Sequence, residues 1–336
     1  MEQIPHLLEV ETPKPDQSKA ISTQEAKEQK VQDAKKAREK SLENPRREQF
    51  RVSIVSGWIF KPRNNTGRYS FFVLLASLVL VNGILLLNPN FYNSITLEDG
   101  LIEYLGFAFL LLTAIFLLVS GTKSVSKPES LVLCAMGLLF FFMAGEEISW
   151  GQRWFQIETP TLLLEINHQK ELNLHNINKQ YFIWLVEAGT LIFTVAGAAF
   201  CIAGITRLWH IPLPNEWIIS CFALSAFYYQ YPQGEFHFRL LHFNAIPVVA
   251  LLTYSIVKKQ RTMFGVSLSN LLVLALLVFL HLSYHENFPA NGNGAYEISE
   301  TLFALSCMAY ALYIQSRIPE NNLEKDQAKF KAHTSS

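Results

Sequence analysis

The stretch LVLCAMGLLFFFMAGEEISWGQRWF, residues 131–155, decides the fold, because a strongly apolar run ends in it at two adjacent carboxylates, Glu146 and Glu147. A bilayer core about 30 Å thick needs about 20 residues of apolar helix to cross it. Residues 131–150 supply that length. We therefore expect a membrane-spanning helix that delivers both acids to a membrane surface.

The composition of the whole chain agrees with this reading. Half of the 336 residues (50 %) are hydrophobic, and the charged residues gather toward the two ends. The mean hydropathy is positive, which favours a polytopic membrane protein over a soluble domain. A formal net charge of +0 argues against nucleic-acid binding. All cysteines lie inside apolar runs without a CxxC pair, so we expect neither disulfides nor thiolate metal sites: Cys134, Cys201, Cys221 and Cys307.

Apolar runs of similar length recur along the chain, and together they predict an all-α, polytopic membrane bundle of about eight spans. Residues 1–50 are polar and charged and are expected to form a disordered cytoplasmic tail, because they cannot bury enough apolar area. Residues 51–68 mix basic and apolar side chains, as a segment at the membrane surface does. The transmembrane domain is 69–318 and a second tail is 319–336, with spans near 69–88, 100–120, 131–150, 181–206, 216–231, 240–257, 264–285 and 296–316.

The basic residues predict the orientation, because Lys and Arg in short connections stay on the cytoplasmic side. Under the eight-span count, most of them fall on one side, and both termini are then cytoplasmic. The opposite connections contain only Arg153, Lys170, Lys179 and Arg239. The basic residues of the cytoplasmic side are Arg46, Arg47, Arg51, Lys61, Arg63, Arg68, Lys123, Lys127, Arg207, Lys258, Lys259, Arg261, Arg317, Lys325, Lys329 and Lys331.

Acids and imidazoles gather at the outer ends of the expected spans. An ionised side chain in a membrane helix costs about 2.5–3.5 kcal/mol, so these groups need compensation. The compensating group is expected to be a protonated histidine, Arg153 or Arg239, a bound metal, or water in a cavity open to the outside. The residues concerned are Glu98, Asp99, Glu103, Glu146, Glu147, Glu187, His237, His242, His281, His285, Glu297 and Glu300.

A zinc site is one interpretation of this polar end. His281 and His285 are four residues apart on one helical face, a spacing that can bind one zinc ion. His237 is a third candidate ligand. The alternatives are histidines that simply sit at the membrane interface, or a bis-histidine haem. Further candidate zinc ligands are Glu103, Glu146, Glu147 and His175.

The candidate catalytic residues are four acids and one arginine. Glu146 and Glu147 can act as general acid and base when their environments separate their pKa values. The alternative is a polar helix end in which Glu147 pairs with Arg153. Glu103 and Glu187 complete the set of candidate catalytic acids. Glu187 lies about two turns into its span, where a carboxylate needs a partner or a pathway.

The outer connection that follows Glu147 is unusually polar, and its side chains either contact substrate or build the loop. Trp150, Trp154 and Phe155 fit the role of interfacial anchors. Residues 161–166 are expected to form a short helix on the membrane surface. The candidate substrate or structural residues are Gln152, Asn167, Gln169, Glu171, Asn173, His175 and Asn176.

These motifs resemble a family of uncharacterised bacterial polytopic membrane proteins with the signature EDGxxEY, GEEISWGQR, ETP and NxQxExNLHN. The matching series here begins at Glu98, Gly145, Glu158 and Asn167, and it covers residues 96–177. The resemblance implies a bacterial inner-membrane protein with its site around this region, and it implies no reaction. A weaker likeness is to membrane metal hydrolases of the ceramidase and progestin-receptor superfamily, which also have a late HxxxH pair.

The leading functional hypothesis is a membrane-embedded, zinc-dependent hydrolase or transferase that acts on a membrane lipid or a lipid-linked substrate. A metal-bound water would attack, Glu146 or Glu147 would move protons, and Arg153 would orient an anionic head group. The alternatives are a proton-coupled transporter that uses Glu187 and Glu103, and a scaffold or assembly factor whose N-terminal tail binds a cytoplasmic partner.

Overall fold

The computed structural model describes residue 29 and residues 65–97, 100–124, 126–167, 169–209, 211–227, 245–284 and 293–334. Within these ranges, the side chains of 179, 180, 182, 183, 281, 282, 284, 293–296 and 319–334 are not described. The chain divides into two units, Met1–Lys61 and Pro62–Ser336. The fold described below is that of the second unit.

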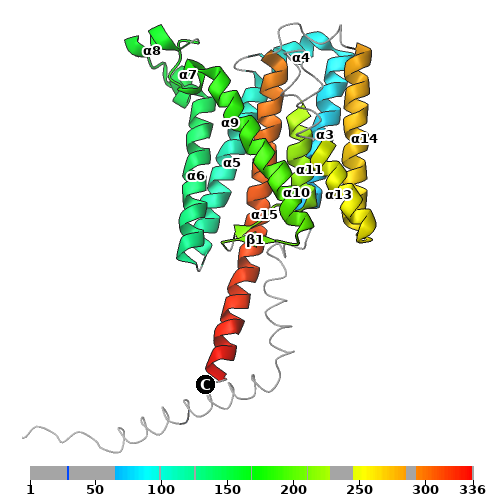
Figure 1. The fold of residues 1–336 in the computed structure, drawn as a ribbon. Helices are drawn as coiled ribbons and strands as arrows, with labels where there is room; N and C mark the ends of the chain where they lie inside the picture. Colours follow the sequence, from blue (N-terminus) through cyan, green and yellow to red (C-terminus); the bar gives the residue numbers. More distant parts are fainter. Residues whose placement is uncertain are drawn as a thin grey trace, which may run out of the picture. The chain divides into compact units, whose positions relative to one another are not determined.

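The second unit is a helical bundle (Figure 1). Its membrane-length or near-membrane-length helices run antiparallel to their neighbours along the chain, and short helices and turns connect them. The elements are α3 Thr66–Leu87, α4 Pro89–Ile95, α5 Leu101–Lys123, α6 Lys127–Glu147, η1 Ser149–Gly151, α7 Gln152–Phe155, α8 Thr161–Ile166, η2 His175–Ile177, α9 Lys179–Leu191, η3 Ile192–Ala196, α10 Gly197–Ile202, β1 Arg207–Leu208, β2 Ile211–Pro212, α11 Glu216–Ser225, α13 Ile246–Val257, α14 Arg261–Tyr284 and α15 Asn293–Thr334.

The prediction of a helical bundle with helices suited to a membrane is confirmed. Five helical segments of the described chain are long and apolar enough to cross one: Thr66–Leu87, Leu101–Lys123, Lys127–Glu147, Trp184–Ile202 and Arg261–Leu280. α11 and α13 have 10 and 12 residues, fewer than the about 20 that a bilayer requires. They flank residues 228–244, which lie outside the described chain. Most of the predicted N-terminal tail and of the predicted interfacial segment 51–68 also lies outside it.

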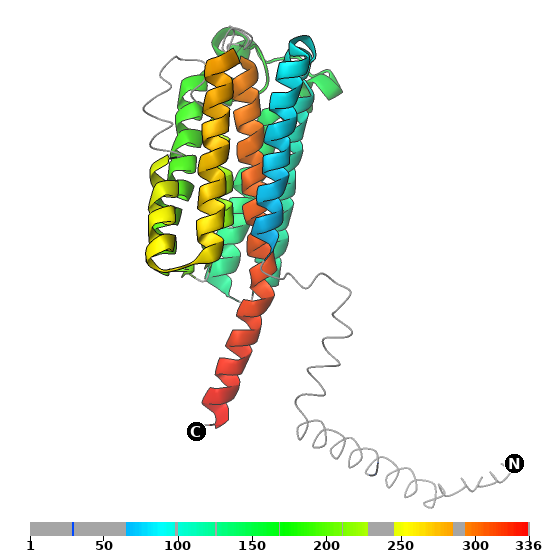
Figure 2. The same ribbon diagram turned by 90° about the vertical axis from the view of Figure 1, so that its right-hand side faces the viewer.

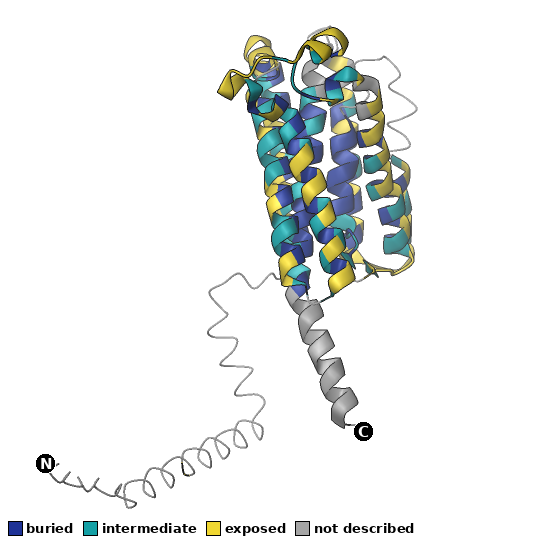
Figure 3. Cartoon of the chain, turned by 90° about the vertical axis from the view of Figure 1, so that its left-hand side faces the viewer, coloured by how far each residue is buried: buried dark blue, intermediate teal, exposed yellow. Residues whose placement is uncertain are grey.

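The surface of the bundle is apolar and its interior contains many polar side chains. Leu80, Leu138 and Leu272 are 64 %, 61 % and 63 % exposed. In Figure 3, exposed positions run along the outward faces of the helices, and buried positions line the inside. Polar groups that hydrogen-bond between or within helices are stable inside a bundle that lipid surrounds. Buried examples are Asn82, Thr113, Thr190, Thr194, Asn270, Thr301 and Ser306.

α15 is the central helix, although it comes last in the sequence (Figures 1 and 2). Its side chains from Ile298 to Ile314 are mostly buried, and it packs against α3, α5 and α11. The hydroxyl of Thr301 donates to the carbonyl oxygen of Ile102 at 2.9 Å, which ties α15 to the start of α5. Tyr310 donates to the carbonyl of Pro212 at 2.8 Å, which fixes the β1–β2 hairpin to the same helix.

Asparagine side chains start three of the helices. Asn88, Asn178 and Asn215 precede α4, α9 and α11, and each side chain accepts a hydrogen bond from a backbone N–H in the first turn. Such caps satisfy donors that the helix itself leaves unpaired. The helix starts are therefore encoded locally, even where the helices themselves are almost uniformly apolar.

Most of the described basic residues lie at one end of the bundle, where α3, α6 and α14 begin and α5 and α13 end (Figure 1). Arg153 and Lys170 lie at the opposite end, in the connection between α6 and α9. The basic residues of the first end are Arg68, Lys123, Lys127, Arg207, Lys258, Lys259, Arg261 and Arg317. This grouping is the one that the sequence predicted from the alternation of spans.

One interhelical hydrogen bond in the apolar interior gives a test of how polar contacts hold the bundle. The Asn270 amide on α14 donates to the Ser220 carbonyl on α11 at 3.1 Å, and both residues are buried. Asn270→Ala should lower the free energy of unfolding by about 0.6–1.7 kcal/mol, the range measured for such bonds in membrane bundles. Unfolding in mixed micelles measures the change. The control is Thr253→Ala, at an exposed threonine that bonds its own helix; equal stability of the two variants would contradict the prediction.

Candidate functional site

A left-handed turn ends α6 and starts the outer connection. Ser149, Trp150 and Gly151 have φ angles of 48°, 56° and 73°, and each non-glycine residue in this region costs roughly 1–2 kcal/mol. The indole of Trp150 folds back over Gly145, where a Cβ atom would stand 2.8 Å from the ring. The turn therefore depends on glycine at both ends and on contacts strong enough to hold Ser149 and Trp150.

Glu146 provides several of the hydrogen bonds that stabilise this turn. Its carboxylate accepts hydrogen bonds from the indole Nε1 of Trp150 at 2.7 Å and from the backbone N–H groups of Leu174 and His175 at 2.5 and 3.1 Å. The Nδ1 atom of His175 lies 3.8 Å from the same carboxylate. Glu146 is only 3 % exposed. It joins the end of α6 to the far end of the connection, a structural role.

Glu171 holds the middle of the connection. Ser149 donates to its carboxylate at 2.5 Å, and Asn173 donates to it at 2.9 Å and to the Ser149 hydroxyl at 2.8 Å. Arg153 forms an ion pair with the same carboxylate. The charge of Arg153, expected to orient a substrate head group, thus has a partner within the loop.

Two amides complete this network. Gln152 donates to the Thr159 hydroxyl and accepts from the Leu172 N–H, both at 2.5 Å. Asn167 donates to the backbone carbonyl and side-chain oxygen of Asn173 at 2.8 and 2.9 Å and accepts from the Gln169 N–H at 2.9 Å. These contacts support the structural alternative for the polar residues of the connection. Asn176 is also buried, at 3 % exposure, while His175 is half-buried.

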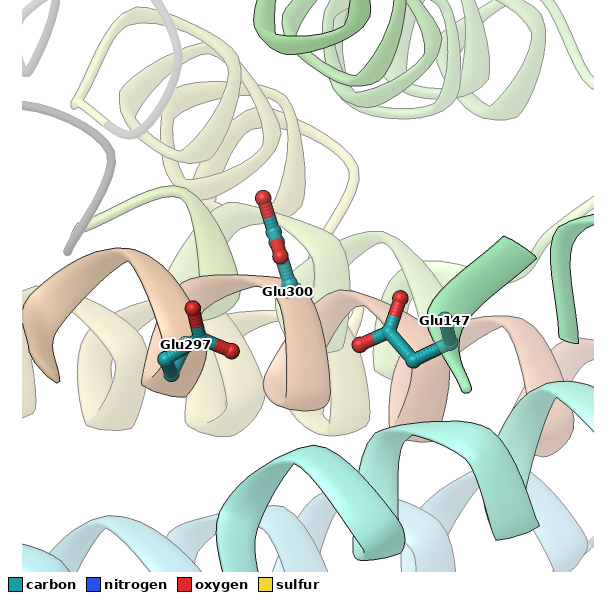
Figure 4. A group of neighbouring side chains, drawn as sticks. All are labelled: Glu147, Glu297 and Glu300. Carbon is teal, nitrogen blue, oxygen red and sulfur yellow. The ribbon is translucent and has the colours of Figure 1, made fainter. Parts of the chain in front are cut away.

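Glu147, the neighbour of Glu146, reaches a different place. Figure 4 shows it extending from the end of α6 toward Glu297 and Glu300 on the first turns of α15. One carboxylate oxygen from each residue lies within 4.8 Å of the others, and all three residues are half-buried. We call these three residues the carboxylate cluster. A Cβ atom at Gly106 of α5 would lie 3.0 Å from Glu147 Oε1, so the missing side chain there leaves room for that carboxylate.

The electrostatics of the carboxylate cluster favour a positive partner. Two unit charges 4 Å apart interact by about 4 kcal/mol at an effective dielectric constant of 20. Glu147 also stands at the C-terminal end of α6, whose partial negative charge disfavours another anion. A divalent cation or bound protons would relieve this repulsion. Carboxylate oxygens are the ligands preferred by hard cations such as Mg²⁺, Mn²⁺ and Ca²⁺, whereas imidazole nitrogens favour zinc.

The remaining predicted catalytic acids lie on neighbouring helices. Glu103 is half-buried in the first turn of α5, one turn before Gly106. Glu187 is 8 % exposed in α9 and shares a helical face with buried Thr190 and Thr194. The π-helical segment η3 begins shortly after it, at Ile192. Such segments often occur at functional sites.

The predicted zinc ligands are not tested by these contacts. The backbone of His281 lies in the last turn of α14, but its side chain is outside the described part of the structure. Several other polar residues expected at this end lie outside the described chain: Glu98, Asp99, His237, Arg239, His242 and His285.

Glu297 and Glu300 were expected at the outer end of the last span, and nothing in the sequence joined them to Glu147. Acids three residues apart at the start of an apolar helix were the available signal. Their partner is about 150 positions earlier in the chain, and it comes near them because α5 packs against both α15 and α6.

Comparison with known proteins finds no match: no family model fits the chain, and no curated protein and no solved structure is significantly similar to it. The resemblance to the uncharacterised bacterial family therefore stays a prediction.

The buried contacts of Glu146 predict how the connection responds to its loss. Glu146→Ala removes the acceptor for two backbone N–H groups and for the Trp150 indole, so the connection should detach from α6 and become sensitive to protease between residues 149 and 178. Three lost hydrogen bonds to a charged acceptor correspond to a few kcal/mol, at about 1.5–3 kcal/mol each before relaxation. Limited proteolysis in micelles measures the change. Glu158→Ala, at an exposed acid of the same connection, should leave the cleavage rate unchanged; cleavage of both variants at the wild-type rate would show that Glu146 does not hold the loop.

Proposed function

We propose that this chain is a multi-pass enzyme of the bacterial inner membrane, with about eight spans and both termini in the cytoplasm. It hydrolyses or transfers a group on a membrane lipid or lipid-linked substrate from the extracytoplasmic side, with a divalent cation bound at the carboxylate cluster. The convergence of Glu147, Glu297 and Glu300 within 4.8 Å is the observation that carries this proposal.

The topology has support from three features of the bundle. Five helical segments reach membrane-spanning length, and the central α15 is buried along the predicted eighth span. Basic residues group at the end of the bundle opposite the carboxylate cluster (Figure 1). By the tendency of Lys and Arg to remain in the cytoplasm, the carboxylate cluster then faces outward.

The two adjacent glutamates have different tasks in this proposal. Glu146 fixes the outer connection, because its carboxylate is occupied by Trp150, Leu174 and His175. Glu147 reaches the cluster and is the better candidate for holding the cation or moving a proton at its carboxylate oxygen. When bound, the cation would polarise a substrate oxygen or lower the pKa of a water.

Metal binding tests the proposal directly. Purified protein should bind about one Mn²⁺ or Zn²⁺ per chain, measured by elemental analysis and by Mn²⁺ paramagnetic resonance. Glu147→Gln with Glu300→Gln should weaken binding by more than about 10-fold, because carboxylate ligands are replaced by neutral amides.

Two further variants separate the outcomes of this experiment. Glu158→Gln with Glu165→Gln removes two exposed acids at the same end of the molecule and should bind metal as the wild type does. His281→Ala with His285→Ala tests whether imidazoles join the site and shift its preference toward zinc. Absence of bound metal in the wild type would overturn the proposal, and loss in the histidine variant alone would assign the ligands elsewhere.

Proton-coupled transport is a second candidate, and buried Glu187 beside the π-helical segment favours it. In sealed vesicles with a pH-sensitive dye, wild-type protein would then carry protons across the bilayer under a membrane potential, and Glu187→Gln would not. Wild-type flux no greater than that of empty vesicles would eliminate this candidate.

A scaffold role remains the third interpretation; an enzyme, unlike a scaffold, should keep its function when residues 1–50 are deleted.

A further inference from the structure

An apolar surface lies on the outer connection, outside the core of the bundle. Phe155 is 73 % exposed and Leu162 is 68 % exposed, values that are unusual for such side chains in water when several lie together. The exposed charged residues of the same segment are Arg153, Glu158, Glu165 and Lys170. We call its exposed apolar side chains the outer apolar face; on α8, Leu162 and Leu164 point to different sides of the short helix. The residues are Trp154, Phe155, Ile157, Leu162, Leu164 and Ile166.

The outer apolar face is held in place and is not a loose loop that can fold over its own side chains. Gln152 bonds Thr159, and Thr159 donates to the carbonyl of Lys170 at 2.7 Å. Trp154 stacks on Tyr104 of α5, with ring centroids 6.1 Å apart. The segment therefore keeps its apolar side chains outward, where something else must cover them.

Trp150, four residues before Trp154, connects the segment to the apolar side of a membrane-length helix. Trp150 contacts Phe142 of α6 edge to face, with centroids 5.4 Å apart, and Phe142 is itself 42 % exposed on that helix. Figures 1 and 2 show α8 projecting sideways beyond the rim of the bundle and not across its centre. In Figure 3, the same segment has the colour of exposed residues.

Exposed aromatic rings also mark this level elsewhere on the molecule. Tyr181 and Trp184 at the start of α9 are 64 % and 50 % exposed and pack against each other at 5.4 Å. Aromatic rings concentrate where acyl chains meet lipid head groups. Trp150 and Trp154 follow the end of α6, and Tyr181 and Trp184 lie in the first turns of α9, so all four rings lie where the connection between these helices joins the bundle.

We infer that residues 154–166 lie in the outer leaflet beside α6, with the outer apolar face among the acyl chains and Glu158 and Glu165 at the level of the head groups. The occupant of this surface is phospholipid. Short apolar segments beside a bundle bind the interface in this way, in proportion to the apolar area they bury. The inference rests on the proposed orientation of the bundle in a membrane, and it is independent of the carboxylate cluster and of any reaction.

Spin-label accessibility distinguishes lipid from water and from protein at this surface. Labels would be placed at Leu162→Cys and Leu164→Cys in a Cys134→Ser, Cys201→Ser background, since Cys221 and Cys307 are buried. The full chain would be reconstituted in vesicles of phosphatidylcholine and phosphatidylglycerol. Oxygen, which partitions into acyl chains, and a water-soluble nickel chelate would then be compared as relaxing agents.

Two reference positions calibrate the measurement. Leu138→Cys on the outward face of α6 reports lipid, and Lys170→Cys in the polar part of the connection reports water. At 162 and 164, the ratio of oxygen to nickel accessibility should be several times that at 170 and should approach that at 138. A ratio equal to that at 170 would overturn the inference. So would a label shielded from both reagents, because a protein partner or a second copy would then cover the face.

Discussion

The hydrogen bonds that Glu146 accepts are the constraint on which the connection between α6 and α9 depends. They connect the last turn of an apolar helix to backbone N–H groups 28 and 29 residues further along the chain. They also hold the indole of Trp150 in a left-handed turn that would otherwise be unfavourable. With this contact in place, Ser149, Gln152 and Arg153 all face partners in the returning segment, and the connection becomes a defined structure.

The adjacency of Glu146 and Glu147 gives the two carboxylates separate surroundings. Consecutive residues on a helix point about 100° apart, so one side chain faces the connection and the other faces α15. Glu146 is surrounded by donors, whereas Glu147 meets two further carboxylates. The end of α6 thus contributes Glu146, which fixes the connection, and Glu147, which belongs to the carboxylate cluster. This arrangement explains why two acids follow an apolar run that would need neither for crossing a bilayer.

Much of the architecture could be predicted from the sequence, because long apolar runs and the placement of Lys and Arg report directly on helices in a membrane. The expected spans 69–88 and 100–120 correspond closely to α3 and α5. The role of the outer connection could not be decided from the sequence, because residues such as Asn167 and Glu171 can bind either a ligand or the backbone of their own loop. Arg153 was expected near a substrate or beside Glu147, and its ion pair with Glu171 depends on a return of the chain that periodicity does not encode. Glu297 and Glu300 were expected at the outer end of the last span, but their approach to Glu147 depends on tertiary packing.

The position of α15 has a consequence for biogenesis. α15 follows the other described helices in the sequence, so the ribosome makes those helices before their common packing partner exists. In the finished bundle, the carbonyl oxygen of Ile102 on α5 accepts a hydrogen bond from Thr301 on α15, and this contact is missing until α15 has been made. The carboxylate cluster is likewise divided between α6 and α15. A chain truncated before α15 would have neither a complete core nor a complete cluster, so the site can assemble only after α15 has been synthesised.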